Sequence, residues 1–550
     1  MSVRFDLVLD NAEILTLDPE RPRAGCIAVL GDRIALVADR GELDGVDAAR
    51  RVDLQGRFVT PGFHDAHNHM QAYGATLNEV PIDAATVRSV EEVVAAIAER
   101  AATTPAGAWI VGAGYDHNKL AERRHPTARE LDRATTEHPV LLNHTSGHFA
   151  QLNSAAMRLA RIGEVGVPEG GVVAVDERGE PNGLLEEQAQ QLVRTLLHPR
   201  RVIDMVTNLG AASDRYLSEG LTSVQEAGVG GILGTAEPLE VAAYQEARRS
   251  GRLRVRVTMM ASVDALHHSD HHVDDHEPFS LDLGLHSGFG DDRLSFGPVK
   301  IFADGSLLGR TAAMFEDFEG EPGNSGYFQM PEKRLHRLIL EAHRSGWQVA
   351  THAIGDRAVA SVLDAYEAAL EAHPRVDARH RVEHAGMTRA DDVERMARLG
   401  VIPVPQARFI SEIGDGMLRA VGERRAADCY RQRSFLDAGL TLPGSSDRPV
   451  VQGAPLLGIH DLVNQRTADG QPFNPREALS PEEAIRAYTL GSATAVFAED
   501  RLGSIEVGKL ADLTVLGDDL TAVDHEAIAG TDVLATMVGG SFEYDAVGLG

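Results

Sequence analysis

Apolar and polar residues alternate in short runs at both ends of the chain, a period typical of half-buried strands. Three such runs begin within residues 1–57, and they are FDLVLDNAEILTL, AGCIAVLGDRIALVA and RRVDLQGRFVT. Residues 498–550 contain two more, GSIEVGKLADLTVLGDD and DVLATMVGGSFEY. Because the two ends of a chain often lie close together, these stretches are expected to form one small β-sandwich.

The long centre, residues 58–497, alternates strand-like segments with amphipathic helices, which indicates parallel βα units. Helices are predicted, for example, at residues 331–346 and 356–373, where apolar residues recur at helical spacing. Eight strands with helices around them predict an α/β protein with a (β/α)8, TIM-like barrel. The eight candidate strands are 58–67, 221–228, 254–262, 297–305, 347–355, 379–386, 401–406 and 440–447.

About 150 residues separate the first two predicted barrel strands, far too many for a single loop. The intervening residues contain helix patterns at SVEEVVAAIAERAA and GLLEEQAQQLVRTLL, with strand patterns at WIVGAG, PVLLNHT and GGVVAVDE. We therefore expect an insertion with its own structure at about 80–215 within the barrel domain.

Length and composition narrow the class of protein. A chain of 550 residues is too long for one compact core, and its 43% apolar and 25% charged residues are ordinary for a globular protein. No apolar run approaches the roughly 20 residues of a membrane span, and the N-terminus has a strand pattern instead of a signal-peptide pattern. Cys26 and Cys429 are too few for a disulfide framework or a cysteine zinc site, so a cytoplasmic location is expected.

The formal net charge is −29, which repels phosphate backbones and anionic membrane surfaces. The expected partner is therefore a small-molecule substrate, with no nucleic acid and no membrane. A homodimer is expected only because homodimers are common among soluble enzymes.

Histidines and one aspartate lie at the carboxyl ends of the predicted barrel strands. His67 and His69 end the first strand, where residues i and i+2 point to the same side, and His352, His384 and Asp447 end the fifth, sixth and eighth. Each alone has an ordinary explanation, as a core histidine with a satisfied ring or an aspartate that caps a turn. Together, at one end of a barrel, they would be costly to bury without a purpose. Histidine and carboxylate are good zinc ligands, so the set favours a metal site.

Lys300 lies in the apolar segment PVKIFADG, where a free ammonium is costly. The chain uses only four lysines, which makes this one more informative. A neutral lysine amine can react with carbon dioxide to give an anionic carbamate that bridges two metals. The alternative is an ion pair of Lys300 with Asp304 or with a more distant carboxylate.

Weaker signals surround this set. His148, Gln225, Asp304 and Arg310 are candidate substrate-binding residues, although a structural hydrogen bond explains each equally well. The tract HHSDHHVDDH at 267–276 follows the third strand. A metal-binding loop and a simple solvated loop are the two alternative interpretations of this tract. A G-x-S-x-G nucleophile elbow is not evident, which argues against a serine hydrolase.

The motifs VTPGFHDAHNH, KIFADGSL, THAIGDRA, RVEHA and GSSDRP together resemble the amidohydrolase superfamily. Within it they are similar to metal-dependent amidohydrolase family 3, which includes N-substituted formamide deformylase, and the resemblance covers nearly the whole chain. It implies a TIM-like barrel with a β-sandwich from both ends, and one or two divalent metals, zinc first. The resemblance also implies a set of metal ligands, which are His67, His69, His352, His384 and Asp447, and it implies that Lys300 is a carboxylated ligand that bridges two metals. His64 is assigned no ligand role, because strand parity points it away from His67.

The activity implied is hydrolysis of a C–N bond, of the amide or N-formyl type, by metal-activated water, with Asp447 as proton shuttle. A hydrolytic deaminase on the same barrel is an alternative, but those deaminases resemble one another in a glutamate where this chain has Gly355. A carbamate, ester or lactone hydrolase would use the same chemistry. The alternative from another class is a metal-free binding or scaffold protein.

Overall fold

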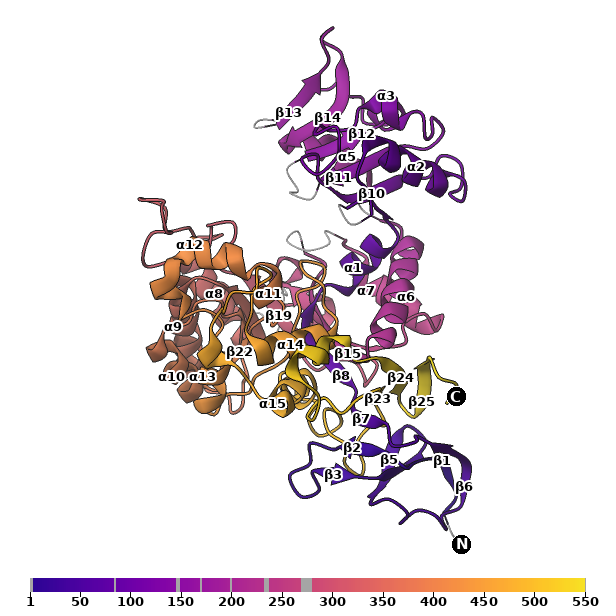
Figure 1. Cartoon of the computed structure of the whole chain (residues 1–550). Helices are drawn as coiled ribbons and strands as arrows, with labels where there is room; N and C mark the ends of the chain where they lie inside the picture. The colour runs from indigo at the N-terminus through magenta and orange to yellow at the C-terminus, as the bar shows by residue number, and fades with distance from the viewer. Residues whose placement is uncertain are drawn as a thin grey trace. The chain divides into compact units, whose positions relative to one another are not determined.

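The computed structural model describes residues 3–83, 86–144, 149–168, 171–197, 200–231, 237–268 and 279–549. The chain divides into two compact units, one made of Met1–Gln71 with Ala212–Gly550 and the other of Ala72–Ala211 (Figure 1). The second unit covers much of the range where the sequence places an insertion, about 80–215. No helix in the described part of the chain is long and apolar enough to cross a membrane.

A seven-stranded parallel sheet lies at the centre of the first unit, in the order β22-β21-β20-β19-β16-β15-β8. Its strands are buried throughout or nearly so, as parallel sheets covered by helices are. The α/β, TIM-like barrel predicted from the sequence is confirmed. The strands are β8 (Phe63–Asn68), β15 (Leu221–Val229), β16 (Arg256–Ser262), β19 (Leu294–Phe302), β20 (Val349–Ala353), β21 (Arg381–His384) and β22 (Ile402–Val404).

The eighth predicted strand is not formed as a regular strand. Residues 440–447, all within the described ranges, instead pass by β8 with scattered backbone hydrogen bonds. Pro443 has no N–H to donate, which prevents a continuous ladder at this position. The segment is nevertheless held in place, because Ala66 N donates to Gly444 O at 2.9 Å and Asp447 N donates to His67 O at 2.7 Å.

The first predicted strand, 58–67, is two strands that belong to two different sheets. β7 (Phe58–Pro61) pairs with the C-terminal strand β23, whereas β8 joins the barrel sheet. Gly62 separates them, and a Cβ at this position would lie 2.3 Å from the Thr222 side chain. The segment that carries His67 is therefore anchored in both sheets.

Both ends of the chain contribute to a six-stranded sheet of order β25-β24-β23-β7-β2-β3, and a four-stranded sheet has the order β5-β4-β1-β6. One hydrophobic cluster draws Leu9 and Val29 from the smaller sheet and Ile14 and Val515 from the larger. The β-sandwich expected from the sequence stays a prediction. The strands are β1 (Phe5–Asp10), β2 (Glu13–Leu15), β3 (Arg23–Ala24), β4 (Cys26–Leu30), β5 (Arg33–Ala38), β6 (Ala48–Asp53), β23 (Leu513–Leu516), β24 (Val533–Val538) and β25 (Ser541–Asp545).

Helices α8 (Glu332–Arg344), α9 (Asp356–Ala372) and α10 (Ala390–Leu399) follow β19, β20 and β21 and pack side by side (Figure 1). The first two lie where the apolar periodicity predicts helices, and most of the apolar side chains of α9 are buried. The remaining longer helices of this unit are α7 (Glu240–Arg249), α12 (Gly414–Ala426), α13 (Gln432–Asp437), α14 (Pro455–Asn464) and α15 (Pro481–Arg486).

The second unit is a six-stranded mixed sheet of order β13-β14-β12-β11-β10-β9, with α2 (Val90–Ala101) capped by Ser89. The helix predicted at 183–197 begins as strand β14 and becomes α-helical only at Gln191. The strands are β9 (Val80–Pro81), β10 (Ile110–Tyr115), β11 (Val140–His144), β12 (Phe149–Leu152), β13 (Gly171–Val175) and β14 (Pro181–Glu187). Helices α1 (Met70–Leu77) and α6 (Val202–Ser218) connect the two units along the chain.

Candidate metal centre

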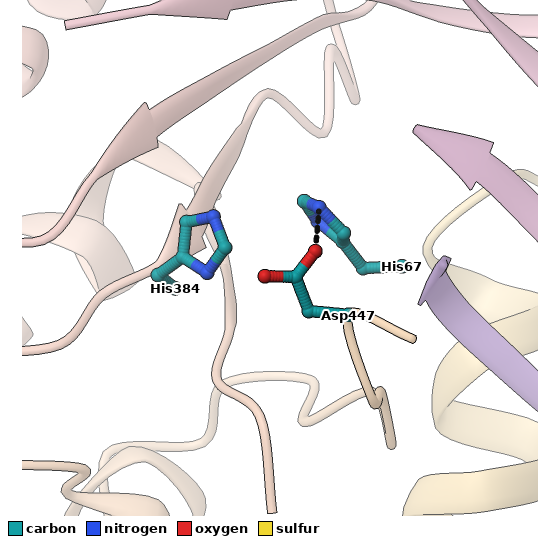
Figure 2. Close-up of side chains that lie close together, drawn as sticks. All are labelled: His67, His384 and Asp447. Carbon is teal, nitrogen blue, oxygen red and sulfur yellow. Dashed lines mark ion pairs between the residues drawn. The ribbon is translucent and has the colours of Figure 1, made fainter. Parts of the chain in front are cut away.

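Three buried side chains at the carboxyl end of the barrel sheet bring metal-ligating atoms together (Figure 2). His67 comes from β8, His384 ends β21, and Asp447 ends the segment that replaces the eighth strand. One ligand atom of each lies within 4.8 Å of the others, and His67 Nε2 is 3.4 Å from Asp447 Oδ1. Two donors each about 2.1 Å from a tetrahedral zinc lie about 3.4 Å apart. The donor set therefore fits a metal of this kind in both chemistry and spacing.

Glu383 fixes the orientation of His67. Its Oε2 accepts a hydrogen bond from His67 Nδ1, and the same carboxylate takes two bonds from Arg381, Nε to Oε1 at 2.7 Å and Nη2 to Oε2 at 2.9 Å. With its proton on Nδ1, the His67 ring has a free lone pair on Nε2, and this nitrogen lies on the side of the ring that faces Asp447. A carboxylate behind a histidine is the usual device for orienting a metal ligand.

Gln406 orients His384 in the same way. His384 Nδ1 donates to Gln406 Oε1 at 2.6 Å, while Gln406 Nε2 donates to Val404 O at 3.0 Å. This leaves Nε2 of His384 as its metal-ligating atom. His384 and Asp447 have φ angles of 70° and 61°, a left-handed backbone that costs about 1–3 kcal/mol in a residue other than glycine. Strain of this kind concentrates at functional sites.

His69 and His352, two further predicted ligands, lie around this cluster. His69 Nε2 is 3.1 Å from Asp447 Oδ1. The His352 ring lies 4.4 Å from the His384 ring, centroid to centroid, and its Nε2 donates to Gly305 O at 2.9 Å. Both are therefore near the centre, and their part as ligands stays a prediction.

Lys300 reaches the centre from β19, with Nζ 3.4 Å from His67 Nε2 and 4.8 Å from the centroid of the Phe302 ring. The side chain is fully buried, and burial lowers its pKa to about 8. A larger fraction of this amine is therefore neutral near pH 7 than for an ordinary lysine. Its role as a bridging ligand stays a prediction.

Burial and charge keep the ligands in their metal-binding forms. Burial, with the nearby Lys300 charge, lowers the pKa of His67 to about 4, and burial lowers the pKa of His384 to about 3. Burial opposes the charged form of Asp447, but the hydrogen bond from His69, whose own pKa is raised by this contact, helps to hold the Asp447 pKa well below its usual range. Neutral imidazoles and an ionised carboxylate are the forms that bind a cation.

Gln225 lies inside the barrel and is engaged by protein groups. Its Nε2 donates to Ser492 O at 2.9 Å and to His64 Nε2 at 3.0 Å, and its Oε1 accepts from Arg381. His64 is thus attached to this network and lies outside the cluster of three ligands. A substrate contact by Gln225 stays a prediction.

The other predicted substrate residues are placed differently. Asp304 accepts backbone hydrogen bonds from residues 313, 354 and 355 at 2.9–3.0 Å, which ties β19 to the loop after β20. Arg310 bonds Glu319 O at 2.9 Å and is 2.8 Å from Glu321 Oε1. His148 and residues 269–276 of the histidine-rich tract lie outside the described residues, so their roles remain as predicted from the sequence.

The two orienting residues, Glu383 and Gln406, are absent from the residues predicted from the sequence. A signal for Glu383 exists, because Arg381 and Glu383 are charged residues at i and i+2 in a buried strand, where paired charges have a purpose. Gln406 gives no comparable signal, since it follows β22 and contacts a residue that is distant in sequence.

The chain matches known proteins along almost its full length. A sequence model of the amidohydrolase family matches residues 50–544. The N-substituted formamide deformylase of Arthrobacter pascens is 31% identical over 565 aligned residues, which cover 100% of both chains. A protein of Bacillus subtilis (strain 168), named amidohydrolase YtcJ, is 31% identical over 506 residues, 91% of this chain and 92% of its own. The crystal structure of an uncharacterized metal-dependent hydrolase from Pyrococcus horikoshii OT3 aligns with a TM-score of 0.77 and 27% identity, over 94% of this chain and 99% of that one.

Proposed function

The chain belongs to the amidohydrolase family, and from that premise we propose that this metal-dependent hydrolase cleaves a carbon–nitrogen bond other than a peptide bond. The observation that carries the proposal is the buried group of His67, His384 and Asp447, whose imidazoles are oriented by Glu383 and Gln406. The proposed substrate is a neutral amide or N-formyl amine. The full-length similarity to a deformylase of N-substituted formamides supports this class.

The proposed metal is zinc, as one or two ions held by His67, His384 and Asp447, with His69, His352 and Lys300 as further ligands. Imidazole and carboxylate are ligands that zinc prefers. When bound, such an ion supplies an acidified water and a Lewis acid for a carbonyl at neutral pH.

Asp447 is the proposed proton shuttle. Its Oδ1 lies 3.1 Å from His69 Nε2 and 3.4 Å from His67 Nε2, so this oxygen sits among the ligand atoms. The carboxylate is ionised at neutral pH, so it has a free lone pair for a proton from water, and its low pKa favours passing that proton on. The same oxygen then returns the proton to the leaving nitrogen.

Lys300 is proposed to carry a carbamate. Neutral Nζ attacks the carbon of carbon dioxide, so that an N–C bond forms and one C=O bond becomes a C–O⁻. The nitrogen then carries two protons, and one of them is lost to solvent or to a nearby base. The product has a net charge of −1 in place of the lysine +1. Support comes from complete burial beside His67 and from a pKa lowered to about 8, both of which favour the neutral amine.

A deaminase that needs a glutamate at position 355 is poorly supported. A Cβ on Gly355 would lie 2.1 Å from the backbone oxygen of Ala313, which leaves no room for a side chain unless the backbone moves. Ester, carbamate and lactone hydrolysis use the same centre and are separated from amide hydrolysis by experiment.

The test is a panel of N-formyl amines, N-acyl amines, the matching esters and cyclic amidines, assayed with zinc-loaded protein. Each kcat/KM is divided by the uncatalysed rate, since esters are intrinsically more reactive. The expected result is a higher ratio for an N-formyl or N-acyl amine than for its ester, and loss of that activity in Asp447→Asn. A higher ratio for esters, or release of ammonia from an amidine alone, would overturn the proposed bond specificity.

A further inference from the structure

A second group of imidazoles and a carboxylate lies in the 72–211 unit, where two neighbouring parallel strands end. Asp116 and His117 directly follow β10, and His144 ends β11, which pairs with β10 through the register Tyr115–His144. His117 Nδ1 is 3.0 Å from His144 Nε2, and Asp116 Oδ1 is 3.9 Å from that same nitrogen. One ligand atom of each of these three residues lies within 4.8 Å of the others.

His117 Nδ1 and His144 Nε2 are hydrogen-bonded to each other, and a metal ion that displaces the shared proton would join the same two nitrogens at nearly the same separation. Two nitrogen donors each about 2.0–2.1 Å from a tetrahedral zinc lie about 3.3 Å apart, close to the separation of the two imidazole nitrogens. Asp116 and His117 are half-buried, and His144 is buried, so the ligand atoms are partly shielded from water. Two histidines and one carboxylate are also the donor types found at the barrel centre.

An aromatic wall holds these imidazoles in place. The His125 ring stacks on the His117 ring with centroids 4.0 Å apart and planes 24° apart, and Tyr115 Oη lies 3.0 Å from His125 Nδ1. The Phe149 ring packs edge-on against His144, with centroids 5.3 Å apart. Burial, together with the charges of His117 and His144, lowers the pKa of His125 to about 4. A neutral His125 accepts the hydrogen bond from Tyr115 Oη, which holds its ring against His117.

We propose that Asp116, His117 and His144 bind one divalent transition-metal ion of the zinc, cobalt or nickel type, at a site distinct in its ligands from the barrel centre. Imidazole donors select these metals, whereas Mg²⁺ and Ca²⁺ prefer oxygen ligands alone. With three ligands from the described part of the chain, one tetrahedral position is left for a further ligand. His144, alone of the three, also lines a cavity of about 320 Å³.

The test uses full-length protein in which His67→Ala and His384→Ala disable the barrel centre. The protein is stripped with a chelator and titrated with Co²⁺, and the visible absorption of the bound ion is recorded. The expected result is saturation at a single equivalent, with affinity weakened more than about tenfold by a further His117→Asn or Asp116→Asn. His138→Asn is the matched control, because His138 belongs to the same unit and its Nδ1 bonds to Ala108 O at 3.2 Å, away from the proposed ligand atoms.

The proposal is overturned if no Co²⁺ binds to the barrel-defective protein, or if His117→Asn and Asp116→Asn leave Co²⁺ binding unchanged. A loss equal to that in His138→Asn counts against it as well. Thermal unfolding followed by circular dichroism checks that each variant is folded. If the protein with both His67→Ala and His384→Ala does not fold, the test uses zinc-loaded protein with an intact barrel centre. Its zinc content is then measured, and His117→Asn is expected to lower the number of bound zinc ions by one.

Discussion

At the scale of single residues, Gln406 provides a hydrogen-bond acceptor behind His384 without touching the predicted ligand atom itself. Gln406→Met removes this acceptor at similar side-chain length, so His384 is free to rotate and change its tautomer. We expect metal affinity to fall about 10- to 100-fold. Competition against a chromophoric chelator measures the change.

Gln406→Glu is the matched control, because it keeps an acceptor for His384 Nδ1. Its affinity is expected to stay nearer to that of the wild type than that of Gln406→Met. Equal affinities for wild type and Gln406→Met would show that the hydrogen bond has no orienting role.

Asp447 is the residue on which the proposed proton transfer depends. Asp447→Asn keeps the side chain's size but removes the basic oxygen and its charge, so kcat/KM is expected to fall about 10²- to 10⁴-fold. Steady-state kinetics on the best substrate of the panel measures it. Asp282→Asn, at a side chain that is 91% exposed, is the control and should change little. A comparable kcat/KM in Asp447→Asn would remove this residue from the mechanism.

Lys300 separates a two-metal centre from a one-metal centre. Lys300→Met keeps an apolar chain of similar length and cannot form a carbamate. In protein prepared with bicarbonate and zinc, the barrel is expected to hold about two zinc ions in the wild type and fewer in the variant. Elemental mass spectrometry gives the count, and an unchanged count in Lys300→Met would exclude a bridging carbamate.

The sequence indicates the residues that the structure brings together because strand ends in a parallel barrel meet at one face. His67, His384 and Asp447 follow from that rule, and their cluster is what the structure contains. Glu383 and Gln406 do not follow, because an orienting contact depends on side-chain direction across strands and not on spacing along one strand. The paired imidazoles of the 72–211 unit are hidden for the same reason.

At the scale of elements, the segment 440–447 places Asp447 without the support of a regular strand. Within this segment, the backbone at Gly444 packs directly against the Tyr488 ring, and a Cβ at this position would lie 2.4 Å from that ring. Gly444→Ala is expected to lower the free energy of unfolding by about 1–3 kcal/mol through overpacking, and to lower kcat by shifting Asp447.

Urea unfolding and steady-state kinetics on the same preparations test the role of Gly444. Gly45→Ala is the control, because nothing lies within 4 Å of a Cβ there. Stability and kcat equal to those of the wild type in Gly444→Ala would show that the segment tolerates displacement.

The periodicity of apolar residues is insufficient to predict where some strands begin and end. Residues 58–67 are predicted as one strand, yet the chain changes sheets at Gly62, where Thr222 of another strand approaches closely. The segment 440–447 begins with a strand-like LTL, but Pro443 interrupts its hydrogen bonds. The helices α8 and α9 are predicted well because their apolar stripes are long and regular.

At the scale of the whole molecule, the order of elements determined the prediction of the fold. Alternating strands and helices predicted the barrel, and the long separation of its first two strands predicted additional structure between them. The parallel sheet of the first unit confirms the TIM-like barrel. Substrate identity does not follow at this scale, since one barrel serves many chemistries through its loops.

The central claim is that a metal at the barrel centre drives hydrolysis of a C–N bond. Its most direct test is formate or carboxylate release from N-formyl and N-acyl amines by chelator-stripped protein, before and after stepwise addition of zinc. We expect that release is lost on stripping, returns in proportion to added zinc, and does not return in His384→Ala. Release that persists in fully stripped protein, or that zinc restores equally in His384→Ala, would show that the metal does not drive hydrolysis.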